Sequence, residues 1–465
     1  MSIALLVPAA LAGVTLEEVV DTARRDSPTM QMGADDLTIA DHTVGMVASS
    51  LMPRISASSR DTYRYSNPEK YTFDYSYDGS ECVPTEEDPC IPFVVVEGQV
   101  VIPSESWSRS RSLSGSQTLS VDPVMDLLEQ RQRRVSTTIQ VRSEEEGLIF
   151  DLIGAYTDLQ YQRGQEALYI ESIALAEEME AAVTGQHAAG EATDLDLESA
   201  RLDTASARLD LLQLTRTLPL SLDDMAQTAG VADLDALAVC DFGPPLDDGD
   251  ELNLAGSSTL ARLESTLAQE TLGRRAGRLD LVPDLALNGG LTWAGSGVEY
   301  GELADATTFD NWYVGGSLST TLFDGGATYH QRRSDAASLH RAQIDLTSGR
   351  ESLQLDDALL AQSLVEIAEE AALLDLSIDI SERNVVATRS RYFDGGQVPL
   401  DAYTQARASL EQLVLQRLAL EAERQDLTAM RWINAGLTDD FLTELFAADK
   451  RSAASGRCQP LSRQD

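Results

Sequence analysis

The chain has 465 residues, enough for two to four ordinary domains or one large elongated one. It carries 35 Lys and Arg residues against 76 Asp and Glu residues, a net charge of −41, which argues against the basic face that a nucleic-acid-binding protein needs. Hydrophobic residues make up 43% of the chain but aromatic residues only 6%. Such a chain can bury apolar stripes, but it is poor in the large aromatic residues that fill thick globular cores.

An apolar run, Ile3–Ala12, opens the chain, and Ala10-Leu11-Ala12 has the small-x-small pattern of a secretory cleavage site. We therefore expect residues 1–12 to be a signal peptide, although a basic n-region is missing. The alternative is a short apolar start to the first helix. Gly13 is followed by Val14 rather than Cys, so we expect no lipid anchor. No stretch reaches the roughly 18 consecutive apolar residues of a transmembrane helix.

Four cysteines bear on the compartment. Cys82 and Cys90 bracket a Pro- and acid-rich loop, and their short spacing in an exported chain favours a disulfide that closes this loop. Cys240 and Cys458 both lie outside the expected long helices. They are candidates for a second bridge, and the alternative is two free thiols.

The sequence contains an internal repeat. Ser27 and Pro53 begin and end a segment that matches one from Ser257 to Pro283 without a gap. A second match aligns the segment that opens at Gly190 with the one that opens at Gly396. Two matches in the same order indicate a duplication of roughly 200 residues. We therefore expect a first repeat, a linker or equatorial segment, a second repeat and a C-terminal equatorial or flexible tail, at residues 13–230, 231–256, 257–437 and 438–465.

Each repeat reads as helix, strand, loop, strand, long helix, turn and helix. The long helices are expected at about 124–185 and 328–392, where Pro is absent and apolar residues recur at positions i, i+3, i+4 and i+7. At about 1.5 Å per residue, a helix of about 60 residues spans about 90 Å, which no compact domain holds. Helices of this length are typical of coiled coils.

Glycines follow each long helix, at Gly190 in the first repeat and at Gly395 and Gly396 in the second. Glycine supplies the left-handed cap that ends a helix. Each long helix is therefore expected to fold back on a partner, at about 191–229 or 399–435. Shorter helices at about 15–50 and 257–281 are expected to stack on these partners.

Four segments alternate between apolar and polar residues with period two, the pattern of β-strands, at about 55–65, 107–121, 285–293 and 312–322. Strands of this length cross a bilayer when tilted, and small polar residues suit a water-filled lumen. Aromatic residues lie near the strand ends, as in membrane aromatic belts: Tyr63, Tyr65, Trp107, Trp293, Trp312 and Tyr313. Four strands cannot close a barrel, so several chains would have to share one. The alternative is a soluble pair of hairpins.

These parts, in this order, resemble the TolC-type outer-membrane factors over about residues 14–437. The resemblance is carried by Thr15-Leu16-Glu17-Glu18-Val19, Ser27-Pro28, Leu51-Met52-Pro53 with Leu281-Val282-Pro283, Leu322-Phe323-Asp324-Gly325-Gly326 and Arg391 to Asp401. It implies a mainly α fold with a membrane β-barrel portion. Long coiled-coil helical hairpins would form a periplasmic α-barrel, and each chain of a trimer would give four strands to a shared 12-stranded β-barrel.

The resemblance also implies a function without a chemical reaction or a cofactor. Outer-membrane factors are passive exit ducts of tripartite efflux pumps and type I secretion systems. Their partners are an inner-membrane transporter, a periplasmic adaptor and outer-membrane lipid, and their location is the outer membrane with a large periplasmic portion. The cargo is chosen by the transporter and adaptor, so nothing in this chain distinguishes drug, metal and protein export.

In this family the hairpin turns form the periplasmic entrance, closed by charged or tyrosine links. The resemblance therefore makes Asp194, Asp196, Asp394 and Asp401 candidate entrance and selectivity carboxylates. It makes Arg389, Arg391 and Tyr392 candidate closing links, with Gly190, Gly395 and Gly396 in the turns. Two positions that are acidic in the family type are Ala402 and Gln405 here. For each residue taken singly, the alternative is an ordinary charge at a solvated helix end.

Two rival classes remain open at this point. An enzyme would need a convergent polar site, yet the motifs of phosphate-binding loops, hydrolases and zinc proteases are absent. The four histidines of the chain are scattered on expected helices, and we expect none of them in a metal site: His42, His187, His330 and His340. A soluble or peripheral coiled-coil scaffold of the cell envelope would explain the long helices. It would not explain paired strands at matching places in each repeat.

Overall fold

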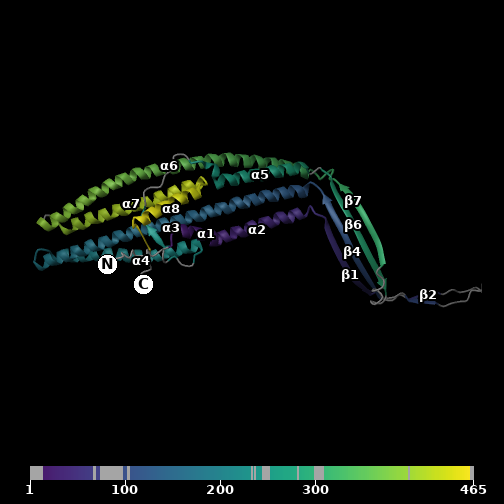
Figure 1. The fold of residues 1–465 in the computed structure, drawn as a ribbon, viewed down its shortest axis with the longest axis horizontal. Coiled ribbons are helices and arrows are strands. Elements are labelled where there is room, and N and C mark those ends of the chain that lie inside the picture. Colours follow the sequence, from purple (N-terminus) through teal and green to yellow (C-terminus); the bar gives the residue numbers. More distant parts are fainter. Residues whose placement is uncertain are drawn as a thin grey trace, which may run out of the picture. The chain divides into compact units, whose positions relative to one another are not determined.

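The structure is a computed structural model that describes residues 14–65, 70–73, 98–101, 105–231, 234, 237–242, 252–279, 282–297, 308–395 and 398–460. The chain divides into two units. One unit is largely helical and comprises Met1–Val44, Glu129–Arg274 and Arg333–Asp465. The other holds the main β-sheet and comprises Gly45–Leu128 and Arg275–Arg332. Figure 1 labels the helices α1–α8 and the strands of the main sheet.

The first repeat contributes four helices: α1 (Leu16–Asp26), α2 (Pro28–Ser49), α3 (Asp122–Ala188) and α4 (Asp194–Ala229). The single helix expected at about 15–50 is wrong, because the chain turns at Ser27. Ser27 has an extended backbone, and its Oγ accepts a hydrogen bond from the N–H of Met30 at 3.2 Å. Pro28 then occupies the first position of α2, where its missing N–H costs nothing.

The second repeat contributes α5 (Ser258–Leu279), α6 (Ala327–Gly395) and α7 (Leu400–Asn434). The two long helices, α3 and α6, have 67 and 69 residues, close to the lengths expected from the sequence. A short 3-10 helix, η1 (Leu254–Gly256), precedes α5. None of the described helices carries an apolar stretch long enough to cross a bilayer.

Each long helix pairs with the helix that follows it (Figure 1). Between α3 and α4, Arg208 forms an ion pair with Glu177, and the side-chain amide of Gln162 donates to the Ser221 hydroxyl. Between α6 and α7, Arg417 contacts Asp375 at 2.8 Å. The two helical hairpins predicted from the glycine turns are therefore present.

The main sheet is antiparallel, with the strand order β1 (Arg54–Tyr65), β4 (Glu105–Leu119), β6 (Asp284–Gly297) and β7 (Thr308–Ser319). The two hairpins expected from the sequence are β1–β4 and β6–β7, and pairing of β4 with β6 joins them into one sheet. Two smaller sheets pair β2 (Lys70–Phe73) with β3 (Gly98–Val101), and β5 (Ala238–Cys240) with β8 (Cys458–Pro460).

The two faces of the main sheet differ in polarity because successive side chains point to opposite faces. One face carries small polar side chains, among which Ser56 bonds to Ser114 at 2.8 Å and Ser58 bonds to Ser112 at 2.9 Å. The opposite face is mostly apolar. Its exposed large residues include Ile55, Leu113, Leu119, Leu285, Leu287, Trp312, Val314 and Leu318.

The main hydrophobic core lies in the helical unit and is centred on α3. Leu152, Ile153, Tyr156 and Leu159 are fully buried, at 0% exposure. They cluster with buried residues of other helices: Leu16, Val19 and Val20 of α1, Leu222 and Met225 of α4, and Ala429 and Trp432 of α7. The apolar periodicity that predicted α3 therefore marks the residues that bring the two repeats together.

The C-terminal segment corrects a prediction. From residue 438 we expected an equatorial or flexible tail, and the flexible alternative is wrong, because Thr438–Ala454 forms helix α8 and Cys458–Pro460 forms strand β8. Phe441, Leu442 and Leu445 are buried in the main core. Their spacing along the helix places them on one face, and this face packs against residues that are remote in the sequence.

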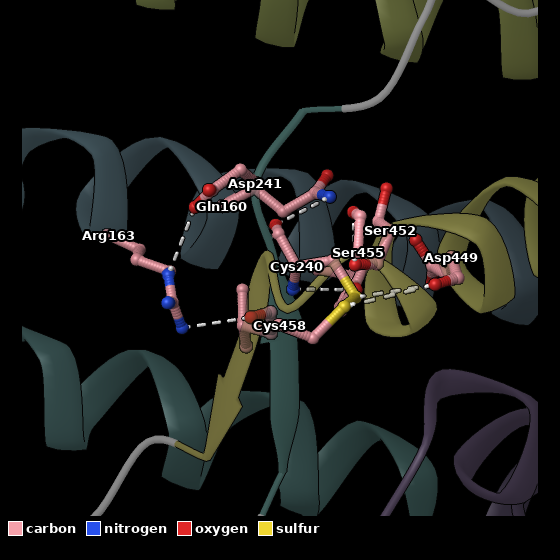
Figure 2. The surroundings of a disulfide bond; sticks show 10 residues. Gln160, Arg163, Cys240, Asp241, Asp449, Ser452, Ser455 and Cys458 are labelled. Carbon is pink, nitrogen blue, oxygen red and sulfur yellow. Dashed lines mark hydrogen bonds and ion pairs between the residues drawn. A yellow bond between two sulfur atoms is a disulfide. The ribbon is translucent and has the colours of Figure 1, made fainter.

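A disulfide between Cys240 and Cys458 ties this segment to the linker after the first repeat (Figure 2). The surrounding backbone is held by α3, because Gln160 donates to the carbonyl of Cys240 at 3.0 Å and Arg163 donates to the carbonyl of Val239 at 2.9 Å. The other expected bridge, between Cys82 and Cys90, lies outside the described residues.

We predict that replacing both bridged cysteines, Cys240→Ser with Cys458→Ser, lowers the thermal stability of the helical unit. Removing a native disulfide that closes a long loop typically costs about 2–5 kcal/mol. The melting temperature of the oxidised wild type should exceed that of the double variant, and addition of a reductant should remove most of the difference. Equal melting temperatures for the oxidised wild type and the double variant would contradict the prediction.

Candidate channel entrance

The hairpin turn between α3 and α4 is set by Gly190. Its φ of +78° lies in the left-handed region, which glycine adopts without a steric penalty. The N–H of Gly190 donates to the carbonyl of His187, and the N–H of Glu191 donates to the carbonyl of Gln186. These bonds satisfy carbonyls at the end of α3, as a helix-terminating motif requires.

Asp196 forms a capping box with Thr193 at the start of α4. Its carboxylate accepts hydrogen bonds from the N–H of Thr193 at 2.9 Å and from the Thr193 hydroxyl at 2.7 Å, while the N–H of Asp196 donates back to the Thr193 hydroxyl oxygen. The hydrogen bonds that it accepts from Thr193 hold the pKa of Asp196 below its ordinary value. The predicted entrance carboxylate is thus also the N3 residue of the capping box that begins its own helix, with Thr193 as the N-cap.

The other acidic candidates whose side chains are described form fewer hydrogen bonds than Asp196. Asp194 has a side chain that is 97% exposed, and one of its oxygens lies 2.7 Å from Nε2 of His187. Asp401 is exposed in the first turn of α7. Asp394 and Gly395 lie in the last turn of α6. The predictions for the side chain of Asp394 and for Gly396 fall outside the described residues.

An apolar cluster lies beneath the two turns. Its buried members come from three helices: Met179 and Val183 of α3, Ala200 of α4, and Leu400 and Tyr403 of α7. Val385 and Tyr392 of α6 pack against it. The four helices of the two hairpins, α3, α4, α6 and α7, therefore meet at this cluster. Within one chain, the ends of the two hairpins pack against each other.

Polar links join the hairpins around this cluster. The hydroxyl of Tyr392 in α6 donates to Oε1 of Gln186 in α3 at 3.1 Å. Arg389 in α6 forms an ion pair with Glu178 in α3. Burial and the nearby negative charge of Asp196 raise the pKa of Tyr392, so its hydroxyl remains protonated as a donor at neutral pH. Arg391, the third predicted link, is exposed and forms no ion pair within the described residues.

A further link was missed by sequence reasoning. Arg407 of α7 contacts Asp203 of α4 at 3.0 Å, and the Arg407 side chain is only 8% exposed. Burial raises the pKa of Asp203, an effect that the Arg407 charge opposes. Nearby, the Ser172 hydroxyl of α3 donates to Glu411 of α7 at 3.1 Å. Periodicity places such residues on helices, but it does not say which helices face one another.

By sequence, the chain matches no protein-family model and no curated protein. Solved structures match its fold. The outer-membrane protein VceC from Vibrio cholerae is 13% identical with a TM-score of 0.70, over 90% of this chain and 96% of that chain. The CmeC outer-membrane channel of Campylobacter jejuni is 15% identical with a TM-score of 0.67, over 95% and 90%. The open MtrE outer-membrane channel of Neisseria gonorrhoeae is 15% identical with a TM-score of 0.69, over 92% and 90%.

The chain has the fold of these outer-membrane channels. The match includes the helical hairpins and the sheet together, since it extends over nine-tenths or more of the chain. The outer-membrane-factor fold expected from the ordered sequence motifs is therefore confirmed. Within this fold, the residues singled out by the sequence lie where the two hairpins end and are linked.

We predict that the tip of the first hairpin loses order in acid because of Asp196. A carboxylate with a lowered pKa in the folded state stabilises that state above the ordinary Asp pKa, about 3.9. This contribution is lost as the pH falls through the lowered value. Hydrogen exchange, corrected for its intrinsic pH dependence, should show faster opening of the first turn of α4 as the pH is lowered below the ordinary pKa of Asp.

The matched variants are Asp196→Ala and Asp194→Ala. The first should open the turn already at neutral pH, because it removes the carboxylate that accepts from the N–H and the hydroxyl of Thr193. The second should keep the wild-type behaviour, since Asp194 does not cap the helix. Equal exchange in wild type and Asp196→Ala at neutral pH would show that the cap is unimportant.

Proposed function

We propose that this chain is the outer-membrane exit duct of a tripartite export system, and that it conducts substrates passively to the cell exterior. The observation that carries the proposal is the fold match over nine-tenths or more of the chain to outer-membrane channels from several bacteria. The mostly apolar face of the main sheet supports a location in a bilayer, and the Ser- and Thr-rich face supports a wet lumen. The alternative of a coiled-coil scaffold does not account for a sheet with one apolar and one polar face.

The working unit is a homotrimer in this proposal. Three chains would contribute four strands each to one barrel, with β7 of one chain beside β1 of the next. The partners would be an inner-membrane transporter and a periplasmic adaptor that docks at the hairpin tips. This chain would need no metal-binding or nucleotide-binding site of its own, because the transporter would supply the energy for export.

The hairpin ends would form the periplasmic entrance. Tyr392 and Arg389 would restrain it, since they hold α6 against α3. The exposed carboxylates of Asp194 and Asp401 would be tripled into rings by the three chains, and rings of carboxylates favour cations. Asp196 would act mainly by keeping the turn in shape.

The first test is conductance in planar bilayers, with the oligomer mass measured on the same detergent-extracted protein. We predict trimers that form cation-selective channels. Neutralising the exposed carboxylates with Asp194→Asn and Asp401→Asn should shift the reversal potential in a salt gradient toward lower cation selectivity. A protein that remains in the soluble fraction and forms no channels would refute the proposed function.

The second test addresses the links. We predict that Arg389→Gln combined with Tyr392→Phe raises the single-channel conductance several-fold, because both contacts between α6 and α3 are lost. Arg383→Gln is the matched control, since Arg383 pairs with Asp379 within α6. Its conductance should equal that of the wild type. An unchanged conductance in the double variant would remove the gating role from these links.

A further inference from the structure

The apolar face of the main sheet is interrupted by charge at one end. Between the ends nearest the helices and the middle of the strands, the large side chains of this face are mainly Leu, Val and Trp, and Gln117 and glycines stand between them. One layer across the strands joins Leu119, Leu285 and Leu318, and a second joins Leu113, Leu291 and Trp312. Beyond the second layer come Arg111, then Arg109 beside Asp61. We call Asp61, Arg109 and Arg111 the charged patch.

Two members of the charged patch neutralise each other. Nε of Arg109 lies 2.9 Å from Oδ1 of Asp61, and Nη2 lies 3.1 Å from Oδ2, so the pair is bidentate. The Arg109 side chain is only 13% exposed. Arg111 differs, because it is exposed and forms no ion pair within the described residues. Its neighbours across the sheet are Ser59 and Trp293, neither of which carries a charge.

The level of the charged patch can be estimated from the strand geometry. Arg111 lies eight residues along β4 from Leu119, and Arg109 lies ten. At about 3.3 Å per residue and a tilt of about 35–45°, these positions are about 19–22 Å and 23–27 Å above the Leu119 layer. The lipid-facing band of a membrane barrel is about 25 Å tall. The patch therefore lies at the upper edge of this band.

Aromatic residues mark the same edge. The rings of Tyr63 and Trp107 are 4.8 Å apart in the next layer beyond Arg109, and Trp293 faces Arg111 across β4 and β6. Aromatic girdles lie at the level of the lipid headgroups. An arginine at mid-bilayer costs about 2–4 kcal/mol, whereas one at the headgroup level can meet a phosphate.

We propose that the charged patch binds a phosphate of an outer-leaflet lipid, with Arg111 as the main contact. The proposal rests on the proposed function, because it requires this face to lie in a membrane. The Asp61–Arg109 pair carries no net charge and supports the sheet beside Arg111. The net charge of the charged patch is therefore +1 per chain, carried by Arg111, and a phosphate has the opposite charge. A guanidinium is also well shaped for bidentate contact with phosphate oxygens.

The test measures lipid binding to the intact oligomer in mild detergent by native mass spectrometry. The probes are diphosphoryl lipid A and the same lipid with both phosphates removed. We expect the wild type to prefer the phosphorylated probe. Arg111→Ser should lower the affinity for it by about fivefold, the value of one cationic contact near a lipid surface. Arg111→Lys should keep most of the affinity.

Arg60→Ser is the matched control, because Arg60 is an exposed residue of β1 that points to the opposite, polar face. It should bind the phosphorylated probe like the wild type. Equal affinity in the wild type and Arg111→Ser, or an equal loss in Arg60→Ser, would overturn the lipid site. Channel recordings on the same samples separate the two proposals. If the wild type forms channels but Arg111→Ser binds the lipid as well as the wild type does, only the lipid site is refuted. If the wild type forms no channels, both proposals are refuted.

Discussion

The outer strands of the main sheet, β1 and β7, each pair with a single strand among the described residues. One edge of each strand therefore presents backbone N–H and C=O groups that need partners from elsewhere. In water such an edge is a template for pairing with another chain. In a bilayer every unsatisfied group costs several kcal/mol. A single copy of this sheet is unsuited to either solvent, so backbone hydrogen bonding alone calls for a sheet shared between chains, as in the proposed trimer.

Periodicity in the sequence was enough to predict the long helices and the four main strands, because both are defined by side-chain patterns within one segment. It failed where local signals conflicted or were weak. Ser27-Pro28 interrupts a segment that otherwise reads as one helix, since Ser27 caps the helix that Pro28 begins. Helix α8 was missed because its own segment does not reveal that its apolar residues, among them Phe441, Leu442 and Leu445, reach the main core. Their burial depends on partners hundreds of residues away.

The entrance shows the same division between local and long-range information. The role of Asp196 in the capping box of Thr193 could have been found, since Thr-x-x-Asp before an apolar helical stretch resembles the capping-box signature. The Arg407–Asp203 pair could not, because each residue alone resembles an ordinary surface charge. Only the packing of α7 against α4 shows that this arginine is buried. The acidic composition therefore says little until individual carboxylates are placed, and several at the hairpin ends are engaged in caps and ion pairs.

The Cys240–Cys458 disulfide has one further consequence. Cys240 follows the last helix of the first repeat, and Cys458 follows α8, which comes after the second repeat. The bond therefore joins the trailing ends of the two halves. If the backbone were cut between Asp241 and α5, the two fragments would remain covalently attached in an oxidising compartment. Each fragment would carry one helical hairpin, and the two would lose their covalent link only when the disulfide is reduced.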